Sequence, residues 1–312
     1  MLGLSADLRG ARRTQPAVKA SVVLAAVCVL FGFGGAQAAA FPRGDAAGAL
    51  TIGGLNRTYT VHSPPGLDRP AGLVLNLHGA GMTGPAQAGA TNYNAIADQY
   101  GFVVAYPDGV DMSWADGRGA SLPNRQRVDD VGFLVALAER LREEYGVDPG
   151  HVFVTGTSAG GFMASRLACE RADIFAAAAP VAGTLASSFP CAPSQPVSVL
   201  AVHGTADPVV PFAGGPMVGR GGPSAIVAPA AMAQRWRELD GCPAPVEQVQ
   251  GTVHRFVAAG CAGGTEVVFV QIDGGGHVWP GGLFAPFDAS QSSGQFFATH
   301  GRVSRRLCLR LV

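Results

Sequence analysis

Short apolar runs alternate with longer stretches of helical spacing along most of the chain. Apolar runs of about four to eight residues, bounded by turn residues, are typical of buried strands, whereas apolar positions three and four residues apart indicate helices. The strands predicted in this way are 57–62, 73–77, 102–106, 151–155, 174–181, 197–202 and 266–272. The predicted helices are 93–100, 129–145, 161–169, 229–239 and 289–300.

The alternation of strands and helices predicts βαβ units around a mostly parallel sheet. A single domain over 41–300 accounts for the pattern, because no repeat and no low-complexity linker interrupts it. Short strands are expected within 243–260, whereas 110–127 and 208–223 are expected to be long loops. The tail, 301–312, matches no predicted element.

The first forty residues have the pattern of a secretory signal peptide. A basic region at 9–19 precedes an apolar run at 20–33, and small residues suited to cleavage follow at 36–40. A membrane anchor is the alternative, but the apolar run is short for a membrane span. We therefore expect 1–40 to be removed and the mature protein to be secreted to the periplasm or the medium without an anchor. Its first residues, 41–50, are expected to be flexible.

Composition argues against several classes of function. Charged residues make up 14% of the chain and hydrophobic residues 48%, which is typical of a folded protein. From residue 41 onward, 18 arginines stand against 21 acidic residues, and this net charge of −3 gives no electrostatic reason to expect a nucleic-acid partner. The single lysine, Lys19, lies in the predicted signal peptide, so the mature protein has no lysine nucleophile.

Export allows the cysteines to be read as a disulfide framework. Beyond the signal peptide the cysteines are Cys169, Cys191, Cys242, Cys261 and Cys308. The first four allow three pairings, and we expect the two that are near in sequence, Cys169–Cys191 and Cys242–Cys261. A metal site is disfavoured because the chain has no C-x-x-C or H-x-x-x-H spacing, and we expect neither metal nor cofactor.

The stretch Gly156-Thr157-Ser158-Ala159-Gly160 lies between a predicted strand and a predicted helix. A G-x-S-x-G sequence in that setting predicts a nucleophile elbow, a tight turn that exposes its serine. Both glycines are needed because a side chain at either position would collide with the neighbouring strand or helix. A chance match is the alternative in a chain with 44 glycines. We take Ser158 as the candidate nucleophile.

A serine nucleophile needs a base, and the base needs a group that orients it. His277 and Asp207 each follow a predicted strand, as Ser158 does. All three therefore lie at carboxyl ends of strands, where clefts form in open parallel sheets. The order Ser158, Asp207, His277 is also the chain order of the α/β-hydrolase triad.

Other side chains compete for these roles. Asp273 is the rival acid, but it lies only four residues before His277 on the same strand end, so we favour Asp207. His203 lies within a strand end and is expected to be structural. His78 is expected to form hydrogen bonds with loop backbone.

The tetrahedral intermediate of acyl transfer needs N–H donors for its oxyanion. We expect the backbone N–H groups of Ala159, which follows the nucleophile, and of Ala80, in the turn at 78–81. Pocket shape is expected to depend on the loops at 110–127 and 208–223. The residues expected to line the substrate cleft, each with ordinary loop packing as its alternative, are Trp279, Trp114, Met82 and Phe212.

An ordered set of motifs resembles one family. The motifs are Leu77-His78-Gly79, Tyr106-Pro107-Asp108-Gly109-Val110, Asp129-Asp130-Val131-Gly132-Phe133, Gly156-Thr157-Ser158-Ala159-Gly160-Gly161, Pro180-Val181-Ala182-Gly183, His203-Gly204-Thr205-Ala206-Asp207-Pro208 and Gly275-Gly276-His277-Val278-Trp279-Pro280-Gly281. Together they resemble secreted esterases of the polyhydroxybutyrate depolymerase and feruloyl/acetylxylan esterase group over about residues 50–300. The resemblance implies an α/β-hydrolase fold with helices on both faces of the sheet. It also implies the Ser158, Asp207, His277 triad and the Cys242–Cys261 disulfide.

We therefore expect an exported serine carboxylic ester hydrolase that works through an acyl-enzyme. The expected substrate is a hydroxyalkanoate oligomer or a plant cell-wall ester. Many polymer depolymerases carry a linker and a separate substrate-binding domain, for which this chain leaves no room, so we favour soluble or short esters. The alternatives are a serine peptidase on the same fold and a non-catalytic secreted binding protein.

Overall fold

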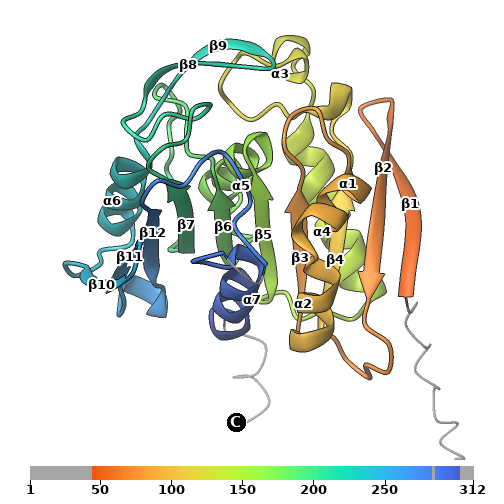
Figure 1. Cartoon of the computed structure of the whole chain (residues 1–312). Coiled ribbons are helices and arrows are strands. Elements are labelled where there is room, and N and C mark those ends of the chain that lie inside the picture. Colours follow the sequence, from red (N-terminus) through yellow and green to blue (C-terminus); the bar gives the residue numbers. More distant parts are fainter. Residues whose placement is uncertain (1–43, 283–284, 303–312) are drawn as a thin grey trace, which may run out of the picture. The chain divides into compact units, whose positions relative to one another are not determined.

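The computed structural model describes residues 44–282 and 285–302 (Figure 1). The predicted signal peptide, Cys308 and most of the expected tail lie outside the described residues. Within the described ranges, none of the helices combines the length and the apolar character that crossing a membrane requires.

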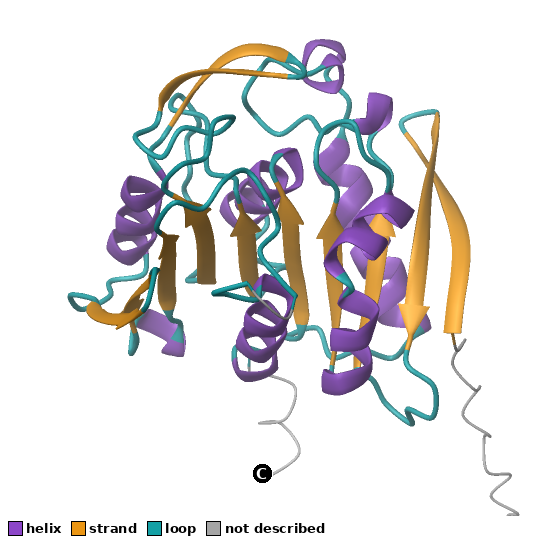
Figure 2. Cartoon of the chain, in the orientation of Figure 1, coloured by secondary structure: helices purple, strands orange, loops and turns teal. Residues whose placement is uncertain are grey.

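A ten-stranded sheet forms the centre of the described chain (Figures 1 and 2). Its strands are β1 (Gly44–Ile52), β2 (Leu55–Ser63), β3 (Gly72–Leu77), β4 (Phe102–Pro107), β5 (Val152–Thr157), β6 (Ala177–Val181), β7 (Ser198–Gly204), β10 (Val246–Gln250), β11 (Val253–Ala258) and β12 (Val267–Ile272). Their order is β1-β2-β4-β3-β5-β6-β7-β12-β11-β10. The strands from β4 to β12 in this order run parallel, whereas the hairpins at both edges pair antiparallel.

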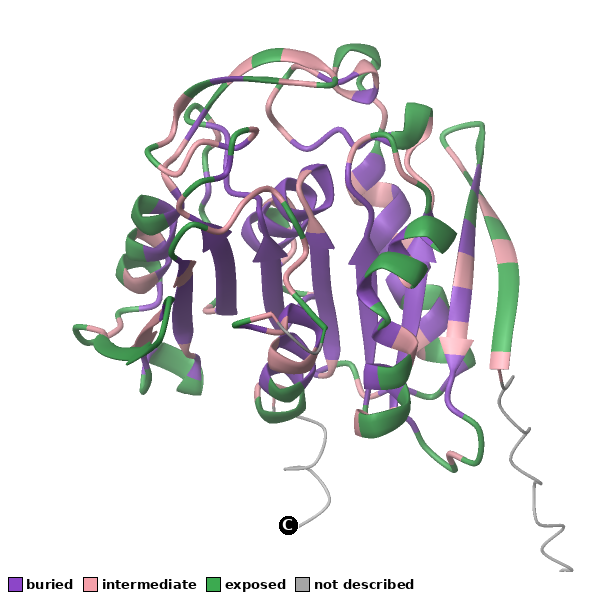
Figure 3. Cartoon of the chain, viewed as in Figure 1, coloured by how far each residue is buried: buried purple, intermediate pink, exposed green. Residues whose placement is uncertain are grey.

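Helices cover both faces of the sheet. On one face, α4 (Asp130–Glu144), α5 (Ala159–Glu170) and α6 (Pro229–Leu239) pack into one hydrophobic cluster. On the other, α2 (Tyr93–Tyr100) and α7 (Ala289–Thr299) pack into a second cluster, with α1 (Gly84–Thr91) beside them. The parallel strands between these layers are buried almost throughout (Figure 3). This arrangement confirms the predicted α/β-hydrolase fold class.

Two segments that were expected to be irregular contain strands. Residues 44–52, within and just beyond the segment expected to be flexible, form β1, which pairs with β2 along its whole length. The long loop at 208–223 contains β8 (Gly215–Gly219), which forms a hairpin with β9 (Gly222–Ile226). Most residues of β1 and β8 are small or exposed. Backbone pairing rather than side-chain burial therefore holds these two strands in place. Hydrophobic patterning therefore does not reveal them.

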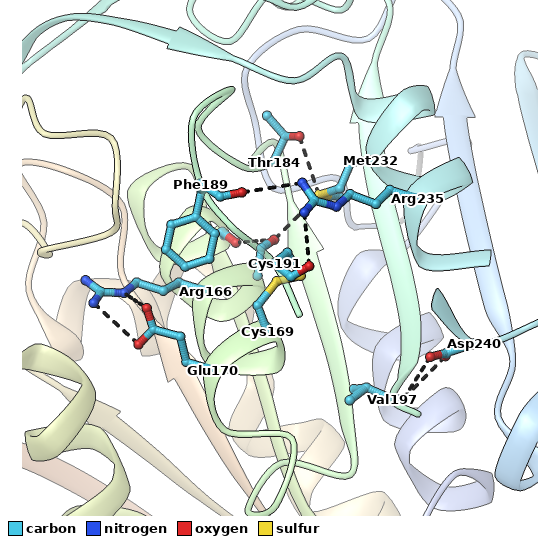
Figure 4. The surroundings of a disulfide bond; sticks show 12 residues. Arg166, Cys169, Glu170, Thr184, Phe189, Cys191, Val197, Met232, Arg235 and Asp240 are labelled. Atoms are coloured by element: carbon cyan, nitrogen blue, oxygen red, sulfur yellow. Dashed lines mark hydrogen bonds and ion pairs between the residues drawn. A yellow bond between two sulfur atoms is a disulfide. The ribbon is translucent and has the colours of Figure 1, made fainter. Parts of the chain in front are cut away.

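Both expected disulfides are present. Cys169, near the end of α5, is bonded to Cys191, and Cys242 is bonded to Cys261. Arg235 of α6 reaches towards the first disulfide and donates to the carbonyl oxygen of Cys191 at 3.0 Å (Figure 4). The Cys169–Cys191 link therefore connects α5 with the segment on which α6 packs.

Two buried or partly buried charges join distant parts of the chain. Asp130 accepts a hydrogen bond from Arg57 of β2 at 2.6 Å and one from the backbone N–H of Ala115 at 2.6 Å. Arg302, in the segment expected to be a tail, donates to the carbonyl oxygens of Ala172 at 2.6 Å and Phe175 at 2.8 Å. The first described residues of that segment are thus tied to the body of the protein.

Asp240 has an unfavourable environment for an ionised carboxylate. Its side chain is fully buried after α6, where it accepts a hydrogen bond from the backbone N–H of Val197 (Figure 4). It also accepts a hydrogen bond from the Thr265 hydroxyl. Burial raises the pKa of Asp240 from its ordinary value of 3.8 to about 6. Between these values the unfolded chain loses the proton while the folded protein retains it. Asp240 therefore decreases the stability of the folded state as the pH rises through this window.

We expect Asp240→Asn to remove this pH dependence. Wild-type protein should lose on the order of 2 kcal/mol of unfolding free energy relative to the variant between pH 4 and pH 7.5. Urea denaturation of both proteins at the two pH values measures the difference. Asp68→Asn, at an exposed position, is the matched control. An unchanged difference between the wild type and Asp240→Asn at the two pH values would contradict the assignment.

Candidate active site

Ser158 occupies a strained turn between β5 and α5. Its backbone has φ 55° and ψ −115°, a region that costs a residue with a side chain about 1–3 kcal/mol. The N–H of Ser158 donates to the carbonyl oxygen of Val181 at 2.9 Å, which holds the turn against β6. A side chain at Gly160 would collide with the carbonyl oxygen of Leu77, and one at Gly156 would lie 2.6 Å from the same oxygen. The local sequence therefore folds as a nucleophile elbow.

His277 and Asp207 meet above neighbouring strands. His277 follows β12 and Asp207 follows β7, and their Nδ1 and Oδ2 atoms lie 2.8 Å apart. The other carboxylate oxygen, Oδ1, accepts the backbone N–H groups of Val209 and Val210, each at 2.8 Å. Burial raises the pKa of the Asp207 carboxyl, but the hydrogen bonds from His277, Val210 and Val209 outweigh it and leave the pKa below its usual value. An ionised Asp207 therefore accepts a hydrogen bond from the Nδ1–H of His277, and this contact favours the neutral tautomer whose lone pair is on Nε2.

His203 has the structural role expected of it. It is buried, its Nε2 lies 2.9 Å from the carbonyl oxygen of Val210, and the same atom lies 3.5 Å from Asp207 Oδ2. Burial lowers the pKa of His203, so the ring is neutral at neutral pH and donates to Val210. Asp207 is therefore flanked by two imidazoles, of which only His277 has a ring that reaches the surface.

Asp273 is not placed to orient His277. Its Oδ1 accepts a hydrogen bond from the Gln271 amide at 2.8 Å, and its Oδ2 lies 3.2 Å from His254 Nε2. His254 comes from β11, the strand that pairs antiparallel with β12 on the side away from β7. Asp273 therefore contacts Gln271 and His254, whereas Asp207 is the acid hydrogen-bonded to His277.

The turn at 78–81 is fixed from beneath by buried hydrogen bonds. His78 Nδ1 donates to the carbonyl oxygen of Gly79 at 2.8 Å, and its Nε2 accepts the N–H of Gly109 at 2.9 Å. The Trp114 indole donates to the His78 carbonyl oxygen at 2.9 Å. His78 thus binds loop backbone, as expected, and holds the turn that carries Ala80. Ala159 is the first residue of α5, where N–H groups lack partners within the helix.

The expected substrate role of Trp114 is wrong. Its side chain is fully buried, and its ring packs against His78 with the ring centroids 4.8 Å apart. The large apolar ring fills the core beneath the turn, so no face of it is available to a ligand. Trp114 is a positioning residue for the turn that carries Ala80.

Replacement of Trp114 by phenylalanine should therefore act on the turn rather than on substrate binding. The change removes the donor to His78 and leaves a buried carbonyl oxygen without it, at a cost of about 1–3 kcal/mol in stability. We expect kcat for a short ester to fall while KM changes little. Steady-state kinetics and thermal unfolding measure the two effects. A rise in KM with unchanged kcat would instead indicate direct contact with substrate.

Ser158 and His277 line one pocket of about 200 Å³. Ala80 also lines this pocket, so the turn at 78–81 and Ser158 border the same space. The rest of the wall comes from the two long loops expected to shape the pocket. Its residues are Ser113, Arg118, Ala120, Ser121, Val209, Met217, Gly219, Arg220, Gly221 and Gly222.

Three other side chains were expected to line the substrate cleft. Among the described residues, the wall of this pocket includes neither Trp279 nor Phe212 nor Met82. Trp279 lines a neighbouring cavity of about 350 Å³ and donates to Ser290 Oγ at 2.9 Å. Phe212 stacks on Phe269 of β12. Met82 is partly exposed beside Gly79.

The sequence did not indicate Arg118, Met217 and Arg220 as lining residues. Arg118 lies in the segment between β4 and α4, and the other two lie in the β8–β9 hairpin. No local pattern separates these two arginines from the others in the chain. Only the fold of two loops that are about a hundred residues apart brings them to Ser158.

Comparison with known proteins decides the family. The chain is 35% identical over 257 residues to “Putative esterase NocK” from Nocardia uniformis subsp. tsuyamanensis, covering 75% of this chain and 74% of that protein. The chain belongs to the α/β-hydrolase esterases. It is also 30% identical over 233 residues to feruloyl esterase B of Piromyces equi. The matched region covers 71% of this chain and 42% of the Piromyces protein.

A solved structure agrees with this fold. The acetyl xylan esterase from Aspergillus awamori superposes with a TM-score of 0.59 at 19% identity, covering 81% of the esterase described here and 98% of that chain. The model of the prolyl oligopeptidase family matches residues 92–190, a stretch that contains the elbow. The family resemblance drawn from the ordered motifs is therefore confirmed.

Proposed function

We propose that this esterase is an exported serine carboxylic ester hydrolase with Ser158 as nucleophile, His277 as base and Asp207 as the acid that orients the base. One observation carries the proposal. His277 is hydrogen-bonded to the buried Asp207 and lines the same small pocket as Ser158. Asp207 orients the base, and the base and the nucleophile border the same pocket, as nucleophilic catalysis by a serine requires.

Acylation begins when His277 Nε2 takes the proton of the Ser158 hydroxyl as its oxygen attacks the ester carbon. The C–O double bond opens to an oxyanion, for which the N–H groups of Ala159 and Ala80 are the proposed donors. The intermediate collapses when the bond to the leaving alcohol breaks. His277 returns its proton to that alcohol, and the acyl group stays on Ser158.

Deacylation repeats these steps with water. His277 removes a proton from a water molecule, whose oxygen attacks the acyl carbon, and the oxyanion forms in the same place. The bond to Ser158 then breaks, and His277 returns the proton to the serine oxygen. The carboxylic acid leaves and the free enzyme is restored. Asp207 remains ionised and stabilises the imidazolium in both halves.

The pocket supports a short ester as the substrate. Its volume of about 200 Å³ is below the range of about 300–1,000 Å³ that drug-sized ligands occupy. An acyl or hydroxyacyl group of a few carbons suits such a space, whether it comes from a hydroxyalkanoate oligomer or from a plant cell-wall ester. Export is supported by the two disulfides, which form and persist in oxidising compartments.

A fluorophosphonate probe and a short-ester screen test the proposal together. We expect the probe to label Ser158, as mapped by peptide mass spectrometry, and His277→Ala to abolish the labelling. The same protein should hydrolyse acetate and butyrate esters of p-nitrophenol. Absence of both labelling and hydrolysis by folded wild-type protein would leave the binding-protein alternative in place.

The match to the prolyl oligopeptidase family favours one second candidate, a peptidase on the same fold. A peptidase must protonate an amine rather than an alcohol as the leaving group. Matched p-nitrophenyl acetate and acetyl p-nitroanilide distinguish the two activities. We expect hydrolysis of the ester alone, and comparable rates on both would favour the peptidase.

A further inference from the structure

Two guanidinium groups line the pocket that holds Ser158. Arg118 comes from the segment between β4 and α4, and Arg220 comes from the turn of the β8–β9 hairpin. Within the part of the chain that the structure describes, the pocket wall contains neither aspartate nor glutamate. The carboxylates that pair with these arginines, Asp116 and Asp111, therefore lie outside the pocket wall.

Arg118 is held rigidly. Its Nε and Nη2 donate to Asp116 Oδ2 at 3.1 and 2.6 Å, and its guanidinium carbon lies 4.0 Å from the centroid of the buried Phe162 ring. Asp116 Oδ1 accepts in turn from Asn124 at 3.1 Å. The Arg118 side chain is only 10% exposed and is already ordered by these contacts. A ligand that binds it therefore causes little further loss of side-chain conformational entropy.

The remaining edge of Arg118 has no strong acceptor. Among the described residues, Nη1 reaches only the thioether sulfur of Met217, at 3.8 Å, which is a weak acceptor. Gly219 leaves the space next to this atom open, because a β-carbon there would lie 3.7 Å from Nη1. A buried and preorganised N–H edge therefore borders the cavity that contains the nucleophile.

Arg220 adds positive charge at the mouth of the pocket. Its Nη1 donates to the carbonyl oxygen of Asp111 at 2.6 Å, and its side chain is 41% exposed. The contact ties the hairpin to the loop after β4. The described pocket wall therefore presents two guanidinium groups and no carboxylate.

We propose that the pocket recognises esters that carry a carboxylate close to the scissile bond, with Arg118 as the specificity-determining residue. This inference rests on the proposed function of Ser158 in the same pocket. A substrate carboxylate would take the free N–H edge of Arg118 in a charge-assisted hydrogen bond. An apolar acyl chain in that place would displace water and leave the N–H groups without acceptors, which is unfavourable. The preferred class is therefore half-esters of short dicarboxylic acids or acylated short hydroxy acids.

Two matched pairs of substrates locate the carboxylate. Monoethyl succinate and ethyl butyrate share a four-carbon acyl chain and differ by a carboxylate on the acyl side. The pair 3-acetoxypropanoate and propyl acetate differs by a carboxylate on the alcohol side. Acid release in a pH-stat gives kcat/KM for each ester. We expect wild-type protein to prefer the anionic member of one pair, and added sodium chloride to reduce that preference.

Arg118→Gln tests the residue itself. We expect the preference for the anionic ester to fall about 30-fold or more, since breaking one buried charge pair costs at least about 2 kcal/mol. Hydrolysis of the neutral ester should change much less. Arg118→Lys, which keeps the charge but loses the planar edge, should retain part of the preference. Arg140→Gln, on the exposed face of α4, is the control that changes net charge equally and should leave the preference unchanged.

Two outcomes would overturn the inference. One is a wild-type enzyme that prefers the neutral member of both pairs, a result that needs no variant to fold. The other is an Arg118→Gln variant that lowers both members of the preferred pair equally, as a structural role would. If no ester in either pair is hydrolysed and Ser158→Ala behaves like the wild type, the proposed function itself fails.

Discussion

Ser158→Ala is expected to lower kcat for p-nitrophenyl butyrate about a million-fold, to the limit set by the remaining oxyanion donors and binding. The hydroxyl oxygen is the atom that forms the acyl bond, and within the pocket wall the only other hydroxyls belong to Ser113 and Ser121. Ser121 Oγ is already engaged, because it donates to the Trp114 carbonyl oxygen at 2.7 Å. Ser121 is therefore not ready to replace the nucleophile.

Stopped assays at high enzyme concentration measure the residual rate. Ser187→Ala, at an exposed position outside the pocket, is the matched control and should keep the wild-type rate. Thermal unfolding should show that Ser158→Ala is folded. A folded Ser158→Ala protein that keeps more than about a tenth of the wild-type kcat would rule out the nucleophile, since a triad serine contributes orders of magnitude more.

Asp207→Asn is expected to lower kcat about 10⁴-fold while the protein stays folded. The Oδ1 atom of Asp207 accepts two backbone N–H groups at 2.8 Å, and the asparagine oxygen can accept the same two. The amide nitrogen must then take the place of Oδ2, which faces His277 Nδ1. A donor in that place favours the tautomer with the proton on Nε2. The ring can then no longer accept the proton of Ser158.

Asp273→Asn is the decisive comparison, because Asp273 has the rival position on the strand end. Its contacts are to His254 and Gln271, so we expect wild-type kinetics within experimental error. The two variants make the same chemical change at strand ends in neighbouring parts of the sheet. A larger loss in Asp273→Asn than in Asp207→Asn would reverse the assignment of the acid.

Local features of the site were predictable because they depend on short stretches of chain. The G-x-S-x-G sequence and its flanking apolar runs predict the elbow from one short stretch of chain. The group that excludes a side chain at Gly160 is the Leu77 carbonyl of the neighbouring strand β3, which only the fold brings there. Positions just past strands predict that Asp207 and His277 lie at one edge of the sheet. The choice between Asp207 and Asp273 needed tertiary structure. Strand β12 presents one acid towards β11, whereas the loop after β7 presents the other towards His277.

The pocket wall was not predictable, because it is assembled from segments far apart in sequence. Residues of the loop after β4 and of the β8–β9 hairpin meet over Ser158, where Arg118 contacts Met217 and Arg220 contacts Asp111. Trp114 was placed wrongly for a related reason. An aromatic residue in a polar, glycine-containing stretch is consistent with the rim of a cleft or with the core. Only the hydrogen bond to His78 and complete burial decide for the core.

The sequence by itself determined the α/β class of fold, the G-x-S-x-G turn and the order of the candidate triad. These features follow from periodicity and from spacings along the chain, whereas the two disulfide pairs were one expected choice among three pairings of four cysteines. Tertiary structure alone decided which acid faces His277, that Trp114 is buried in the core and which charged side chains line the pocket of Ser158. Those properties depend on where side chains from separate loops meet, and hydrophobic patterning does not encode the conformation of polar, glycine-rich loops.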